Sequence, residues 1–140
     1  LARMGVTELA YDWRAEHIAT FDEEIQTMRR WNIDIVAWWF PGALNDEAKA
    51  ILAALKRNDL QTDLWITMHG GEIECTPEEQ AQRVAEHAAA IKPIAEAAAA
   101  QGCTVSLYNH GAWFGEPRNQ IAIIEALKAH GVENVRIVYN

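Results

Sequence analysis

The chain has 140 residues, of which 50% are hydrophobic, so it can bury the core of one domain, which argues against disorder. Its formal net charge of -8, from 20 acidic and 12 basic residues, argues against nucleic acid as a partner, because phosphate binding needs clustered Lys and Arg. No stretch reaches the roughly 20 apolar residues of a membrane span, and we expect a cytoplasmic protein without a membrane partner.

Alternating strand and helix patterns begin near the N-terminus. Residues 7–11 predict a first strand, and residues 21–31 predict a helix. Thr20 and Glu23 have the spacing of a capping box at the start of this helix. Asn32 is expected to end it in the left-handed conformation.

The second βα unit follows at once. Residues 33–40 predict a strand, and Asn45 is placed to cap a helix over residues 46–57. This helix has acids in its first turn and bases in its last, as the helix dipole favours. Residues 64–68 predict the next strand.

The third helix has the strongest start signal. Thr76 caps it, Pro77 fits its first position and Glu79 completes a capping box. We expect it to cover residues 77–101, with Pro93 kinking it or dividing it in two.

The last third of the chain repeats the pattern. Residues 103–108 predict a strand, residues 112–117 an aromatic loop, residues 119–130 a helix and residues 135–139 a final strand.

Five strands separated by four helices predict an α/β fold of parallel βα repeats with right-handed crossovers. Two architectures agree with this order: an open doubly wound sheet, or part of a (β/α)8 TIM barrel, which needs about 250 residues to close. The absence of a Gly-x-Gly-x-x-Gly turn after an early strand favours the barrel. We therefore expect residues 1–140 to form one barrel segment that is incomplete at both ends.

Polar residues follow two of the apolar strands. His69 comes after residues 64–68 and precedes two glycines, while Asn109 and His110 follow residues 103–108. Barrel enzymes place their chemistry at the carboxyl ends of strands, so these side chains are candidates for substrate binding. The alternative is that they satisfy backbone groups at strand ends and turns.

The aromatic loop offers two further candidates. Glu116 is a candidate catalytic base if Trp113 and Phe114 screen its carboxylate from water, and the alternative is a helix-entry carboxylate that favours the dipole. Trp113 is a candidate for stacking on the apolar face of a sugar ring, with core packing as the alternative.

A charged stretch follows the first strand. Asp12 and Arg14 are candidates for binding polar substrate groups, because guanidinium grips phosphate or carboxylate in a fork. The alternative is a surface ion pair between charged neighbours.

The strand ends carry a family resemblance. One strand is followed by Asn109-His110-Gly111 and the next by Tyr139-Asn140. These strand ends resemble the xylose-isomerase-like TIM-barrel family of sugar phosphate isomerases and epimerases. The resemblance spans essentially the whole chain, which would correspond to about strands two to six of the barrel. The resemblance implies proton transfer next to the carbonyl of a sugar or sugar-derived substrate. It also implies a divalent metal ion, manganese, magnesium or zinc, with His69 and Asn140 among its ligands.

The chain departs from this family at two ligand positions. Tyr108 stands where the family has a ligating Glu, and Asn140 stands where it has an Asp. Asparagine offers a neutral oxygen to a cation, but it supplies neither negative charge nor a proton acceptor. These departures leave a second interpretation open, a non-catalytic carbohydrate-binding relative with a degraded metal site. Under both interpretations the expected partner is a small sugar-like ligand, and a homo-oligomer is compatible with either.

Overall fold

A parallel sheet forms the centre of the protein. The computed structural model describes residues 4–139, and within them lie five strands. These are β1 (Glu8–Tyr11), β2 (Asp34–Trp39), β3 (Asp63–Ile66), β4 (Thr104–Tyr108) and β5 (Val135–Val138). All neighbouring pairs are parallel, and the order across the sheet is β1-β2-β3-β4-β5. The prediction of consecutive βα units in an α/β fold is confirmed.

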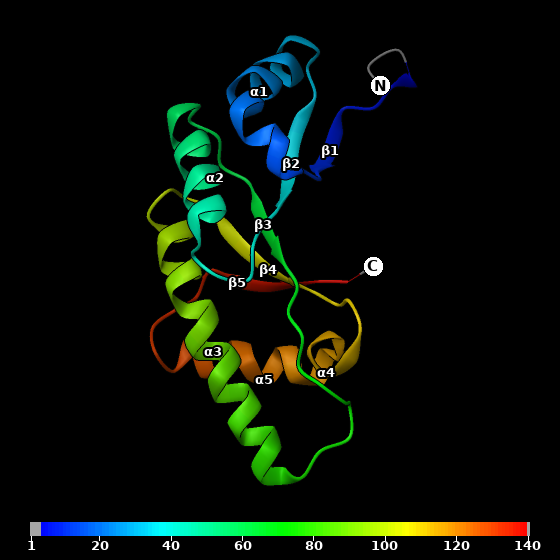
Figure 1. Cartoon of the computed structure of the whole chain (residues 1–140), viewed down its shortest axis with the longest axis vertical. Coiled ribbons are helices and arrows are strands. Elements are labelled where there is room, and N and C mark those ends of the chain that lie inside the picture. The colour runs from blue at the N-terminus through cyan, green and yellow to red at the C-terminus, as the bar shows by residue number, and fades with distance from the viewer. Residues whose placement is uncertain (1–3, 140) are drawn as a thin grey trace.

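Helices connect the strands on one side of the sheet. The connections contain α1 (Phe21–Arg30), α2 (Asp46–Arg57), α3 (Pro77–Ala99) and α5 (Pro117–Lys128), together with the short α4 (Ala112–Gly115) and the 3-10 helix η2 (Ala15–Thr20). Figure 1 shows α1, α2, α3 and α5 on the same side of the sheet. A doubly wound sheet would reverse its strand order and carry helices on both faces, so the sequential order argues against it.

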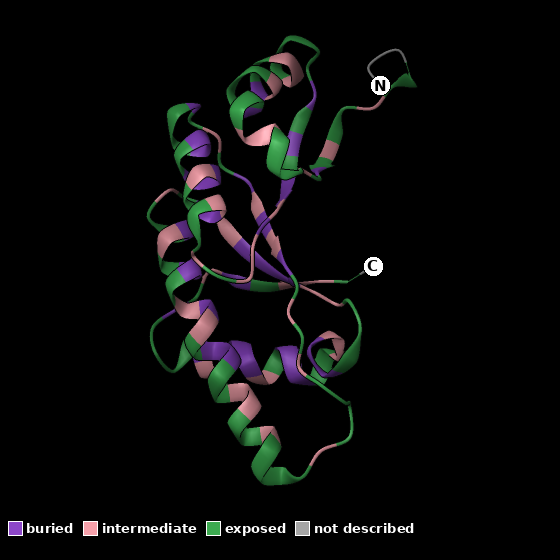
Figure 2. Ribbon diagram, in the orientation of Figure 1, coloured by how far each residue is buried: buried purple, intermediate pink, exposed green. Residues whose placement is uncertain are grey.

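The core lies between the helices and the sheet face that they cover. Leu64 and Ile66 of β3, with Val105 and Leu107 of β4, are completely buried. They belong to one apolar cluster with residues of three helices: Ile51, Leu55, Ile91, Ile94, Ile123 and Leu127. Figure 2 shows this buried layer in purple. Side chains alternate across a strand, so the residues between these apolar ones point to the other face.

The opposite face of the sheet carries a polar network. The Asp63 carboxylate accepts hydrogen bonds from Thr104 Oγ1 at 2.7 Å, Ser106 Oγ at 2.6 Å and Trp65 Nε1 at 2.9 Å. These three donors satisfy a carboxylate that is only partly exposed, and they tie β3 to β4.

Several predicted helix ends are confirmed. Asn45 Oδ1 accepts the Ala48 N–H at 2.9 Å at the start of α2. Thr76 and Glu79 form the predicted capping box of α3, and Asn32 has a φ of 51° after α1.

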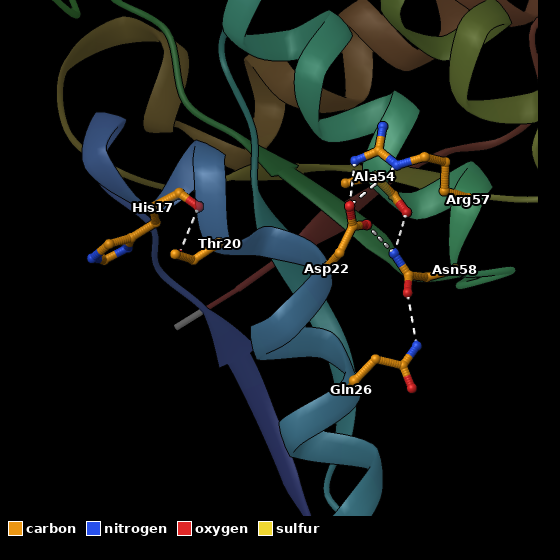
Figure 3. Close-up of polar contacts among 7 residues, drawn as sticks. All are labelled: His17, Thr20, Asp22, Gln26, Ala54, Arg57 and Asn58. Atoms are coloured by element: carbon orange, nitrogen blue, oxygen red, sulfur yellow. Dashed lines mark hydrogen bonds and ion pairs between the residues drawn. The ribbon is translucent and has the colours of Figure 1, made fainter.

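The predicted capping box of α1 is wrong. The Thr20 hydroxyl lies 3.1 Å from the His17 carbonyl oxygen (Figure 3). It also donates to Glu24 Oε1 at 2.6 Å, and it makes no cap bond to the backbone of α1. The unpredicted 3-10 helix η2 runs directly into α1, so Thr20 ends one helix as the next begins. Glu23 therefore has no reciprocal capping role here.

Two further predictions need correction. Pro93 was expected to kink the third helix or to divide it in two, and the division is wrong, because α3 is one helix from Pro77 to Ala99. Residues 112–117 are not an open loop, since they contain the helical turn α4 and the start of α5.

A polar network connects α1 to α2. It lies at the end of the sheet that is farther from α5. Asn58 donates to Asp22 and to the Ala54 carbonyl oxygen, and its own Oδ1 accepts from Gln26 at 2.9 Å (Figure 3). The Arg57 guanidinium, 2.8 Å from Asp22, holds the pKa of that carboxyl below its usual value by a hydrogen bond. Both members of this ion pair are about half exposed, so water screens it and its contribution to stability is small.

Candidate functional site

A cavity of about 450 Å³ opens at the carboxyl ends of β3 and β4. Its lining residues come from the two loops that follow these strands and from the start of α4: Thr67, Met68, His69, His110, Gly111 and Ala112. His69 and His110 are both exposed residues. Two histidines that the sequence analysis selected separately, from different βα units, therefore border one cavity.

An aromatic cluster of Trp39, Trp65 and Tyr108 lies beside this cavity. The Tyr108 ring centroid is 4.7 Å from that of Trp39 and 5.7 Å from that of Trp65, and the two tryptophans are 5.8 Å apart. All three residues are half-buried. Trp39 pairs with Trp65 and Trp65 with Ser106, and Tyr108 is two residues after Ser106, so the three side chains share the sheet face opposite the apolar core. The His110 ring lies 5.9 Å from Tyr108, so the cluster extends to the rim of the cavity.

Gly111 fixes the turn that carries His110. Its φ of 70° and ψ of 160° fall in a region that is essentially restricted to glycine. The His110 N–H donates to the Tyr108 carbonyl oxygen at 2.8 Å, which tightens the turn directly after β4.

Trp113 does not lie on the cavity surface, which corrects the expectation that it stacks on a ligand. Both Trp113 and Phe114 are completely buried, because α4 turns them toward the core. The indole Nε1 donates to Gln80 Oε1 at 2.7 Å. Core packing, the alternative kept open by the sequence, is what the structure shows for this residue.

Trp113 holds the two cavity loops together. Its backbone N–H donates to the Gly71 carbonyl oxygen at 3.1 Å. Gly70 is packed so tightly that a Cβ atom there would lie 2.6 Å from Trp113 Cε3. The loop after β3 and the loop after β4 therefore form one packed unit.

Glu116 and Asn109 lie near the cavity without lining it. Glu116 is half-buried directly before α5, and its carbonyl oxygen accepts the N–H groups of Asn119 and Gln120. This is the helix-entry position that the alternative interpretation gave it, and nothing places its carboxylate as a base in the cavity. Asn109 is half-buried between the aromatic cluster and His110.

Asp12 and Arg14 are remote from the cavity. They follow β1, which is separated from β3 by β2. Both are exposed, and they pair with each other at 2.7 Å, while Arg14 also donates to the Trp13 carbonyl oxygen. The structure brings them together as a surface pair and does not bring them to the two histidines.

The described residues do not supply the donor set of the implied metal. Asn140 lies outside them, and among residues 4–139 no group of three or more His, Cys, Asp or Glu side chains is arranged to hold an ion. Tyr108, where the resemblance leads one to expect a ligating Glu, packs its ring against Trp39 and Trp65. His69 remains the candidate ligand on the cavity.

His87 of α3 contacts the backbone of this site, a role that was not predicted from the sequence. His87 is only 8% exposed, and its Nε2 lies 3.0 Å from the His69 carbonyl oxygen. The sequence gives only a weak indication of this contact, because His87 stands one turn after Arg83 in an alanine-rich helix without a distinctive motif.

The chain matches no protein-family model, and no curated protein matches its sequence. In the part of the chain that the structure describes, no helix is both long enough and apolar enough to cross a membrane.

Proposed function

We propose that this chain is the ligand-binding part of a (β/α)8 TIM-barrel protein, and that a small sugar or sugar-derived compound binds between His69 and His110. The observation that carries the proposal is the convergence of these two histidines on one cavity at the carboxyl ends of adjacent strands. The sequential strand order, with helices on one face, supports the barrel, because closure would turn the uncovered face inward.

The chemistry of the cavity suits a polyhydroxylated ring. Imidazole nitrogens donate to or accept from hydroxyl groups, whereas Met68 and Ala112 offer apolar surface for C–H groups. The adjoining aromatic cluster extends that surface. A volume of about 450 Å³ lies within the range of about 300–1,000 Å³ that is usual for small-molecule sites.

A second candidate function is isomerase or epimerase activity, favoured by the presence of two imidazoles on one cavity. A neutral imidazole can take the proton next to a carbonyl, and an imidazolium can return one, both near neutral pH. This acid–base pair needs no carboxylate, so the substitution of Tyr108 for a Glu does not oppose it.

Ligand-observed NMR with D-xylose, D-xylulose, D-glucose, D-fructose and their phosphate esters tests both candidates. Binding that His69→Ala and His110→Ala weaken supports the site, and incorporation of deuterium from D2O next to the carbonyl adds the isomerase or epimerase activity. Binding without exchange supports a carbohydrate-binding protein. Absence of binding by every compound overturns the proposal.

A further inference from the structure

We propose that His87 is a positioning residue, which holds the backbone of His69 and thereby sets the shape of the cavity. The inference concerns the site of the proposed function and rests on that function for its purpose. Its structural basis is a set of contacts from one face of α3 to both cavity loops.

Three polar residues of α3 share this face. Gln80, Arg83 and His87 follow one another at spacings of three and four, which places them in a row along a helix. We call these three residues the α3 latch. An apolar stripe would be the ordinary choice for a helix face that packs on its own protein.

Each member of the α3 latch binds the loops. Gln80 accepts the Trp113 indole N–H at 2.7 Å, and Arg83 Nη1 donates to the Glu72 carbonyl oxygen at 2.7 Å. The Arg83 guanidinium also lies 5.9 Å from the Trp113 ring centroid. The latch therefore reaches the loop after β3 and the loop after β4 from a single rigid helix.

His87 occupies the most buried position of the latch. Its ring stacks on Phe114, with centroids 5.4 Å apart and planes at 28°, and lies 5.2 Å from Trp113. Nε2 faces the His69 carbonyl oxygen at 3.0 Å, and Nδ1 faces the Arg83 carbonyl oxygen at 2.8 Å. The tautomer with its proton on Nε2 donates to the His69 carbonyl oxygen, whereas the tautomer with its proton on Nδ1 donates to the Arg83 carbonyl oxygen instead. The positioning role requires the first.

The contact to His69 has a direct consequence for the cavity. His69 exposes its imidazole while its carbonyl oxygen points back to α3, so a bond at that oxygen restrains the residue from behind. Without this bond the His69 carbonyl oxygen loses its hydrogen-bond partner on α3. We expect the loop after β3 to open locally more often as a result. The indole of Trp113, which joins the second loop, packs against the same ring at a tilt of 35°.

Two substitutions separate the hydrogen bond from the general effect of changing a buried ring. His87→Gln places an amide N–H near the position of Nε2, whereas His87→Asn reaches only to the position of Nδ1. Ala85→Gly, at an exposed position of α3, controls for weakening of the helix.

Hydrogen exchange of the Trp113 amide, which donates to Gly71, and the ring signals of His69 and His110 are the readouts. We expect His87→Asn to raise that exchange about fivefold and to shift the His69 signals, while His87→Gln stays within about twofold of the unaltered protein. Equal behaviour of the Asn and Gln variants would overturn the proposal. These readouts need no ligand, so they succeed or fail independently of the proposed function.

The unaltered protein provides a second test that no folding defect can obscure. Ring 15N signals should show a proton on His87 Nε2. A ring with an unprotonated Nε2 would contradict donation to His69 and overturn the positioning role.

Discussion

His69 and His110 border the same cavity, although one follows β3 and the other follows β4. Their backbones are held in different ways, His69 through the contact with His87 and His110 through the tight turn at Gly111. Neither imidazole belongs to the core, so each can be changed without removing buried packing.

Substitution of either cavity histidine should weaken ligand binding and leave folding intact. For His69→Ala and His110→Ala we expect a loss of about threefold to tenfold in affinity for the bound sugar, the equivalent of about one hydrogen bond. Calorimetric titration measures the affinity, and thermal melting should change little. His130→Ala, in the exposed turn after α5, is the matched control and should bind normally. Normal binding by both cavity variants would remove these residues from the site.

Gly70→Ala should destabilise the protein and alter the cavity. Its Cβ would meet Trp113 Cε3 at 2.6 Å and the Phe114 nitrogen at 3.0 Å, so the buried indole must shift. We expect a loss of about 1–3 kcal/mol in the free energy of unfolding, as in other overpacked sites, measured by urea denaturation. The control is Gly42→Ala, whose Cβ meets nothing closer than 3.4 Å. If the two variants were equally stable, the close packing of Gly70 on Trp113 would be refuted.

Trp113→Ala should be among the most damaging single changes in the chain. The side chain is completely buried, so its removal leaves a cavity and deprives Gln80 of a hydrogen-bond donor. We expect a loss of about 3–5 kcal/mol in the free energy of unfolding. Trp113→Phe keeps most of the apolar contact and should cost less. A negligible effect of Trp113→Ala in chemical denaturation would instead support a surface role for the indole.

Tyr11 should make stability depend on pH in the alkaline range. Burial raises the pKa of its phenol above the ordinary 10.0, and the hydrogen bond to Glu24 raises it further. The folded state therefore keeps the proton at pH values where the unfolded state releases it, so the free energy of unfolding falls as the pH rises past 10. Tyr11→Phe should reduce this fall, as measured by denaturation at a series of pH values. An identical slope in both proteins would contradict the assignment.

The order of βα units could be predicted from the sequence because its signals are local. Asn45 and Thr76 cap the helices that follow them, and apolar runs between such helices mark the strands. The start of α1 at Phe21 was predicted correctly, but its capping was not, because η2 has no distinctive pattern in residues 15–20.

The supporting side of the candidate site could not be predicted, because it depends on contacts between distant residues. The burial of Trp113 follows from its packing on Gly70 and from its bond to Gln80, and no local pattern around Trp113 encodes either partner. The role of His87 depends in the same way on His69. What the sequence did indicate was the position of both cavity histidines, directly after apolar strands.

Titration of the histidine ring signals with the sugar panel tests the central claim most directly. A sugar that binds as proposed should shift the His69 and His110 signals together, with one common dissociation constant, and should leave His130 unchanged. Absence of any shift at both cavity histidines, while a sugar binds elsewhere or does not bind, would contradict the claim that this cavity is the ligand site.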